Sequence, residues 1–226
     1  LAYGAAFGAI QHMPRILPGL DEVQAKSAEA GQAVSAKALA EGRSAEAAAR
    51  AAGIATRLKE QDITASVTKV QEIGGLLGRV VLVLLIVRIV SRRSVVRCFL
   101  IPGVVIMPLV FAGALTHNLT LSYIGMFVAA LLTVGMFSFW GNYLPRVYPV
   151  HLRGTGESFA ANIGGRMIGT SFAWVTSTLA TATWMPGAAA PDKLAYTAAL
   201  IGFLVFAGGL AASFFLPEPP KEDLPE

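Results

Sequence analysis

Apolar runs alternate with short polar links along most of this chain. A helix needs about 20 mostly apolar residues to cross a bilayer. Six segments meet or approach that length: residues 1–20, 67–90, 98–115, 119–143, 156–183 and 194–216. The pattern predicts an all-α membrane protein with six transmembrane helices, residues 67–216 holding five of them.

The composition agrees with this interpretation. Of the 226 residues, 54% are hydrophobic and 14% are charged, whereas soluble domains carry about 25% charged residues. The one cysteine, Cys98, excludes a disulfide framework and argues against a cysteine-based metal site. We therefore expect no metal and no cofactor.

The two ends of the chain differ in character. Residues 1–20 are short for a complete span, so we expect them to be the outer part of a helix that begins upstream. Residues 217–226 are polar and rich in proline, which predicts a disordered tail.

Basic residues concentrate in two of the links. The link after the second segment holds Arg88, Arg92, Arg93 and Arg97, and the link after the fourth holds Arg146, His151 and Arg153. Residues 116–120, after the third segment, hold neither Lys nor Arg. Because positive residues favour the cytoplasmic side, we expect a multi-pass protein of the plasma (inner) membrane with a cytoplasmic C-terminus.

Residues 21–66 interrupt this alternation and are expected to form an alanine-rich extracytoplasmic loop. Alanine is the best helix former, and Glu46 and Arg50 form an i,i+4 pair. Gly31, Gly42 and Gly53 recur at a fixed spacing and are expected to interrupt the helix. The segment is either a lid or docking hairpin, or a solvated low-complexity insertion.

Pairs of glycines four residues apart predict where helices approach closely, because membrane helices associate through small residues. They place the first, second and fifth segments in the tightest packing and leave the third and sixth as outer, lipid-facing helices. The pairs are Gly4 and Gly8, Gly74 and Gly78, and Gly165 and Gly169.

Charged residues within the bilayer are costly and are functional candidates. Arg79 and Arg166 both fall near the predicted midplane. Glu72 precedes Arg79 by two helical turns, and Asn162 precedes Arg166 by one, so each pair shares a helix face. The alternative is that the two arginines are paired inside the bundle and only hold helices together.

Gln11 and His12 add polar groups on the first segment. His12 is either a proton site or a hydrogen-bonded structural residue, since its unperturbed pKa is close to neutral. Glu72 is a second candidate for proton coupling.

The link over residues 143–166 resembles the corresponding link of the major facilitator superfamily, especially its sugar- and organic-acid-porter branches. The matching residues are Tyr143, Leu144, Pro145, Pro149, Arg153, Gly154, Thr155, Gly156, Phe159, Asn162 and Arg166. Residues 74–93, with Arg88, Arg92 and Arg93 at basic positions, resemble the eighth span and the turn after it. Residues 216–220 resemble the motif that closes many sugar porters.

The resemblance implies that the six segments are spans seven to twelve, the C-terminal bundle of a twelve-span transporter. Its substrate site would lie between this bundle and a missing N-terminal six-span half, near the midplane. The implied cytoplasmic gating residues are Arg88, Arg92, Arg93, Arg146, Arg153 and Gly154.

Two positions depart from the family pattern. Val87 stands where the family usually has Asp, and Arg146 stands where it usually has Glu. In the family these acids pair with arginines and latch the cytoplasmic side. We expect the basic links of this chain to meet acids of the other half or anionic lipid headgroups.

These features predict a secondary active transporter of a small polar solute, coupled to protons or ions and working by alternating access. The candidate substrate-binding residues are Gln11, His12, Arg79, Asn162 and Arg166. An organic anion is preferred over a sugar because arginine binds carboxylates through two hydrogen bonds.

The alternative is a membrane sensor or scaffold of the same fold. An enzyme is not expected, since no HExxH or GxSxG motif occurs. Nucleic acid is not an expected partner, since the arginines lie in short links rather than in a soluble basic domain.

Overall fold

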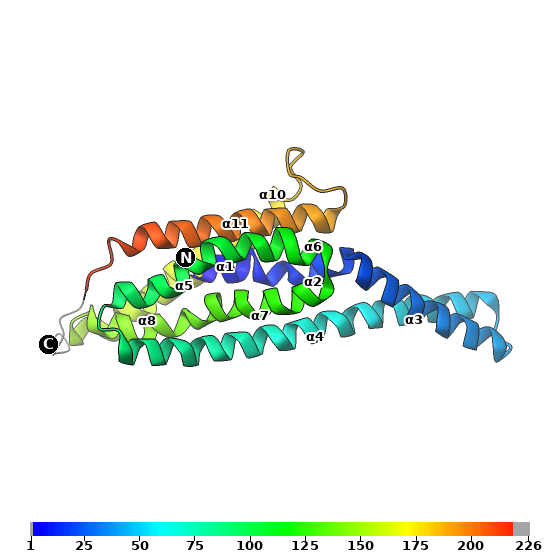
Figure 1. The fold of residues 1–226 in the computed structure, drawn as a ribbon, viewed down its shortest axis with the longest axis horizontal. Coiled ribbons are helices and arrows are strands. Elements are labelled where there is room, and N and C mark those ends of the chain that lie inside the picture. Colours follow the sequence, from blue (N-terminus) through cyan, green and yellow to red (C-terminus); the bar gives the residue numbers. More distant parts are fainter. Residues whose placement is uncertain (1, 219–226) are drawn as a thin grey trace.

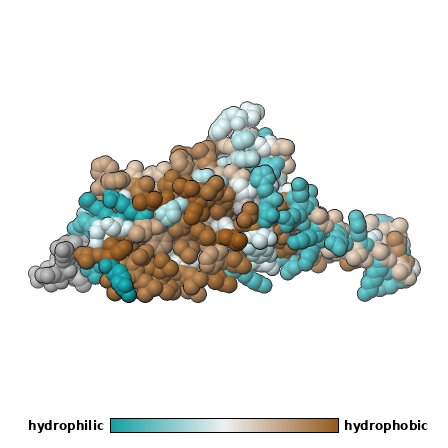
Figure 2. Space-filling model, in the orientation of Figure 1, coloured by the Kyte–Doolittle hydropathy of each residue, from teal (hydrophilic) through white to brown (hydrophobic). Residues whose placement is uncertain are grey.

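The computed structural model describes residues 2–218, except for the side chain of Ala114, and is helical with no strand in that part. Its helices lie side by side along one long axis (Figure 1). Four are long and apolar enough to span a membrane: Ala45–Arg88, Arg92–His117, Leu119–Arg146 and Ala190–Ser213. Apolar side chains cover the middle of the visible face, and hydrophilic ones gather toward its two ends (Figure 2). These features support a multi-pass membrane protein.

These four helices contain several labelled elements. The first is α4 (Ala45–Arg88) and the last is α11 (Ala190–Ser213). The second combines α5 (Arg92–Pro108), the π-helix η3 (Leu109–Ala114) and α6 (Leu115–His117). The third combines α7 (Leu119–Gly135), α8 (Phe137–Tyr143) and the 3-10 turn η4 (Leu144–Arg146), with a further 3-10 turn, η5 (Val150–Leu152), beyond it.

The other two predicted spans are helical but broken. The first comprises α1 (Ala2–Gly8), η1 (Ile10–His12), α2 (Met13–Ile16) and η2 (Leu17–Gly19). The fifth comprises α9 (Arg153–Phe159), the π-helix η6 (Ala160–Met167) and α10 (Ile168–Leu179). Neither is among the four long apolar helices, so the six-span bundle remains an expectation.

Contacts between distant parts of the chain define the two ends of the molecule. At one end, the Ser91 hydroxyl donates to the Glu218 carboxylate at 2.6 Å. At the other, the Leu119 N–H donates to Glu22 at 3.4 Å, and Gly19 lies against Pro191. Since α11 begins at the second end and the tail after it reaches the first, residues 153–179 must carry the chain across the molecule.

Residues 21–66 form most of a helical hairpin that projects beyond the bundle (Figure 1). It consists of α3 (Asp21–Ala40) and the first half of α4. The 44 residues of α4 extend about 66 Å at 1.5 Å per residue, roughly twice the thickness of a bilayer core. The hydroxyl of Ser44 caps the start of α4 by accepting from the Ala47 N–H at 3.3 Å.

Only one of the three spaced glycines interrupts the hairpin helices. Gly42 lies in the turn with φ +76°, a conformation that glycine adopts without steric cost. Gly31 and Gly53 lie inside α3 and α4, so the expectation that they break the helix is wrong. A Cβ at Gly31 would lie 2.4 Å from the Thr56 hydroxyl, so Gly31 allows α3 to approach α4.

The other glycine pairs mark close helix contacts. Gly4 and Gly8 of α1 lie against Phe172 of α10, as the pairing of the first and fifth segments predicts. Gly74 and Gly78 lie against α7, where an added Cβ would come 2.2 Å from a backbone carbonyl oxygen. The second segment therefore packs on the fourth.

The prediction that the sixth segment is an outer helix is wrong. In the most apolar stretch of α11, 56% is buried, against 28% in α4. Alanine and glycine on several faces of α11 allow α1, α5 and α10 to pack around it.

Candidate functional site

A cleft of about 400 Å³ opens between α1, α8 and the α9–η6 segment. One wall is rich in aromatic side chains, and the other is made mostly of alanine and glycine. The lining residues are Ala2, Tyr3, Phe137, Trp140, Gly141, Leu144, Glu157, Ala160, Ala161, Gly164 and Gly165.

Tyr3 joins the two walls. Its ring stacks on Phe137 with centroids 4.6 Å apart and lies 6.1 Å from the Phe7 ring. On the opposite side, a Cβ added at Gly165 or Gly169 would come 2.9 or 2.3 Å from Tyr3. Because neither glycine has a side chain, Tyr3 can pack directly against this helix. This contact sets the distance between the two walls.

The small-residue wall belongs to the eight-residue π-helix η6. In a π-helix the hydrogen bonds run from i to i+5, and such turns occur frequently at functional sites. No other atom lies within 4 Å of a Cβ built on Gly164. This position therefore faces open space in the cleft.

Glu157 is the one carboxyl group among the described lining residues, and its side chain is half-buried. It can accept hydrogen bonds or take up a proton. The ring of Trp140 can pack against planar or apolar groups and attract cations. Together they suit a solute with both apolar and polar parts.

Asn162 and Arg166 lie beside the cleft rather than in its lining. Both are exposed on η6, one position after the lining residues Ala161 and Gly165. The Asn162 amide donates to the Ser158 carbonyl at 2.9 Å and to its hydroxyl at 3.2 Å. Their role in substrate binding stays a prediction.

Gln11 and His12 lie farther along the first segment. Gln11 is exposed, whereas His12 is 4% exposed, and its Nε2 has no hydrogen-bond partner in the described part of the chain. His12 lies nine positions after Tyr3, about 14 Å along a helix. His12 is therefore a buried residue of η1 that lies outside the lining of the cleft.

Arg79 and Glu72 are both exposed on α4, which contributes no residue to the cleft. Glu72 accepts from Gln71 at 3.2 Å. The ion pairs found within residues 2–218 all lie in the hairpin and include the predicted Glu46–Arg50 pair. The alternative in which Arg79 and Arg166 are paired inside the bundle therefore gains no support.

A clasp at the basic end was not predicted. The Glu218 carboxylate accepts from the Ser91 hydroxyl and from the N–H groups of Arg92 and Arg93, both at 3.0 Å. It thus caps α5, where backbone N–H groups favour an anion. The Tyr143 hydroxyl donates to the Pro217 carbonyl at 2.8 Å.

This clasp (residues 216–218 with their partners Ser91, Arg92, Arg93 and Tyr143) corrects one expectation. Pro217 and Glu218 are ordered by contacts, whereas residues 219–226 of the predicted disordered tail lie outside the described residues. The basic link after α4 also meets an acid of the same chain, Glu218, although Val87 and Arg146 stand where the resemblance implies acids. The expectation that the basic links meet acids of another half or anionic lipid headgroups stays a prediction.

The surroundings of Glu218 lower the pKa of its carboxyl group. Burial alone would raise that pKa, but the hydrogen bonds from Ser91, Arg93 and Arg92 and the charge of Arg93 outweigh it. The clasp is therefore made by the ionised carboxylate.

The other predicted gating residues lie near the clasp or in the second link. Arg92 donates to the Ile86 carbonyl at 3.1 Å, which ties α5 to the end of α4. Arg88 is exposed, whereas Arg146 and Arg153 are half-buried. Gly154 has open space around it. Their gating role stays a prediction.

A signal in the sequence exists for some of the site residues that were not predicted. The Gly165–Gly169 spacing predicted a close approach in η6 and α10, but not that Tyr3 would fill it. Trp140 lies in no spacing pattern that singles it out in the sequence. No group of three or more His, Cys, Asp or Glu in the described residues could hold a metal ion.

Comparisons with protein families, with curated proteins and with solved structures find no match to this chain.

Proposed function

We propose that this chain is the C-terminal six-helix half of a secondary active transporter similar to the major facilitator superfamily. It moves a small polar solute by alternating access. The observation that carries the proposal is the cleft between α1, α8 and η6, with its aromatic wall, its small-residue wall and the carboxyl group of Glu157. The basic clasp at one end supports an arrangement in which that end closes on the cytoplasmic side.

The preferred solute class is an organic anion. Arg79 and Arg166 are exposed cations without an ion pair in the described residues. Arginine binds carboxylates through two parallel hydrogen bonds. In this proposal a second six-helix bundle faces η6, and the solute lies between Arg166 and the cleft.

Coupling to protons or ions needs a group that changes charge as the solute moves. Glu157 lines the cleft and Glu72 lies on α4, so Glu157 is better placed than Glu72 to take up a proton beside the solute. Burial of His12 separates it from this path.

A sensor or scaffold of the same fold is the second candidate. The hairpin of α3 and α4 favours it, because a projection about as long as the bilayer is thick exceeds what a short link requires. Such a protein would bind a partner through the hairpin without moving a solute.

The test is uptake by proteoliposomes that contain the full-length protein, offered radiolabelled carboxylates and sugars with and without an imposed pH gradient. The proposal predicts saturable uptake of a carboxylate that the gradient increases. In Arg166→Ala the uptake should fall, and Arg166→Lys should retain part of it. Unchanged uptake in both variants would show that Arg166 is not a site residue, and no uptake of any solute would favour the sensor.

A further inference from the structure

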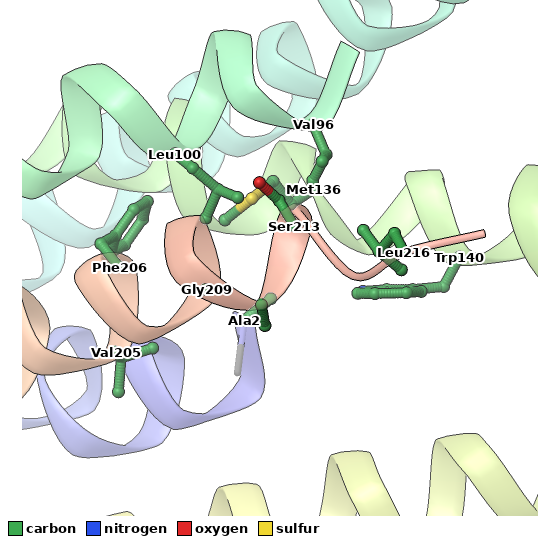
Figure 3. A pocket seen from close by; sticks show the side chains of 11 residues that line it. Ala2, Val96, Leu100, Met136, Trp140, Val205, Phe206, Gly209, Ser213 and Leu216 are labelled. Atoms are coloured by element: carbon green, nitrogen blue, oxygen red, sulfur yellow. The ribbon is translucent and has the colours of Figure 1, made fainter. Parts of the chain in front are cut away.

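A second cavity, smaller than the cleft, lies between α5, α8 and α11 near the clasp (Figure 3). Its volume is about 90 Å³. The walls are apolar except for the Ser213 hydroxyl. The lining residues are Ala2, Val96, Leu100, Met136, Trp140, Val205, Phe206, Gly209, Ala212, Ser213 and Leu216.

The cavity follows one face of α11. Val205, Gly209 and Ser213 recur every four residues on that face. Eight residues of helix extend about 12 Å, so the cavity is elongated along the helix. Figure 3 shows Phe206 toward one end, Leu216 and Trp140 toward the other, and Ser213 between them. The long axis of the cavity therefore runs parallel to the acyl chains of a bilayer that α11 spans.

Two arginines lie at the clasp end of this cavity. The Nε of Arg97 donates to the Ser213 hydroxyl at 2.9 Å, and the Nε of Arg93 donates to the Leu216 carbonyl at 2.5 Å. Ser213 and Leu216 both line the cavity. The Arg97 guanidinium also lies 4.1 Å from the centre of the Phe214 ring, so both cations are held beside the cavity.

Each guanidinium has donors left for an anion. A guanidinium carries five N–H donors. The hydrogen bonds of Arg93 use its Nε, and those of Arg97 use its Nε and one terminal nitrogen. Glu218, which caps α5 through Ser91 and backbone N–H groups, balances only part of the charge of this region.

We propose that this cavity, with Arg93 and Arg97 at its end, binds one anionic phospholipid. Part of an acyl chain fills the apolar cavity beside Gly209, and the phosphate accepts hydrogen bonds from the two guanidinium groups. The apolar walls exclude a free anion, and the paired arginines select a negative headgroup over a zwitterionic one. Trp140 lies at the clasp end of the cavity, as tryptophans do at a membrane interface.

The experiment uses the full-length protein in nanodiscs that contain a trace of phosphatidylglycerol with a photoreactive diazirine in its acyl chain. Crosslinked peptides are mapped by mass spectrometry, with the same probe on phosphatidylcholine as reference. We expect phosphatidylglycerol to label α11 and Trp140 preferentially. Replacing one arginine should reduce that preference roughly fivefold, and replacing both about twenty-five-fold.

The variants separate the two parts of the site. Arg97→Gln and Arg93→Gln should each reduce the preference for the anionic probe by the stated factor, whereas Arg88→Gln, which removes a charge at the same end outside the cavity lining, should retain it. Ala212→Phe should block labelling by both probes at α11. Excess glycerol phosphate should not compete. Equal labelling by both lipids, loss in Arg88→Gln equal to that in Arg97→Gln, or competition by glycerol phosphate would overturn the proposal.

Discussion

Tyr3 packs against Gly169, where any residue with a side chain would overlap it. At Gly169 an added Cβ would lie 2.3 Å from the Cβ of Tyr3 and 3.2 Å from its backbone, so the two helices would have to separate. At Gly164, five residues earlier, nothing lies within 4 Å. Two glycines of one segment therefore have opposite roles, close packing at Gly169 and open space at Gly164.

This difference predicts opposite effects of the same substitution. Gly169→Ala should lower the thermal unfolding temperature, because steric overlap in a packed contact costs about 1–3 kcal/mol. Gly164→Ala should leave it unchanged or raise it, because alanine favours a helix over glycine by up to about 1 kcal/mol. Unfolding of both variants in detergent micelles, followed by circular dichroism, measures the two shifts. Equal shifts would refute the packing role of Gly169.

The lowered pKa of Glu218 predicts that the stability of the clasp depends on pH. Because its carboxyl pKa is lowered in the folded state, its contribution is complete above the usual pKa of Glu, about 4.3. The contribution is lost as the pH falls through the lowered pKa. Hydrogen-exchange protection of the Arg92 and Arg93 amides, corrected for the intrinsic rate, should decline in that range.

Glu218→Gln is the matched variant for this prediction. Glutamine keeps the length of the side chain but removes the charge that favours the start of α5. Protection of the Arg92 and Arg93 amides should be lower than in the wild type at neutral pH and should no longer change in the acidic range. A wild-type protein whose protection stays constant down to pH values well below the Glu range would show that the carboxylate does not hold the clasp.

Part of the candidate site could be predicted at the level of residues. The family-like spacing of residues 143–166 pointed to the segment that forms one wall of the cleft. Asn162 and Arg166 were chosen by counting 3.6 residues per turn, but η6 is a π-helix, whose i to i+5 bonding changes which positions share a face. Tyr3 and Trp140 come from other helices, and no spacing within one segment can place them.

At the level of elements, the hairpin shows that an alanine-rich stretch can extend a helix without an apolar run. The region 45–66 has no apolar run, yet it is continuous with the membrane-length part of α4. The apolar pattern located the helices of the bundle because burial in lipid depends on hydrophobicity. It could not locate the start of α4, which depends on the propensity of alanine and on the Ser44 cap.

The same hairpin provides a matched pair of glycines. Gly53→Ala should stabilise the hairpin by about 1 kcal/mol, since Gly53 lies in mid-helix with nothing within 4 Å. Gly31→Ala should destabilise it, because the new methyl group would meet Thr56 and the Ala52 carbonyl. Limited proteolysis near the Gly42 turn should be slower in the first variant and faster in the second. A gain in both would mean that α3 and α4 are not in close contact at Gly31.

At the level of the whole molecule, the chain runs back and forth between the two ends of the bundle and returns to the end that holds the clasp. The contacts of Glu218 with Ser91 and of Leu119 with Glu22 fix which links share an end. The distribution of arginines predicted the same grouping, because the basic links and the C-terminal residues lie together. Which end faces the cytoplasm stays a prediction.

The cleft is the central feature of the proposed transporter, and alternating access requires that it open to both sides of the membrane in turn. A cysteine at Gly164 would report this directly, since the position faces open space. Ser44→Cys, at the start of α4 in the hairpin, serves as the control that stays on one side.

The most direct measurement is the labelling of Gly164→Cys by a membrane-impermeant maleimide, with Cys98 replaced by serine, in vesicles of both orientations that contain the full-length protein. Alternating access through the cleft predicts that Gly164→Cys is labelled from both sides while Ser44→Cys is labelled from one. Labelling of Gly164→Cys from only one side, at any temperature or pH tested, would contradict alternating access through this cleft.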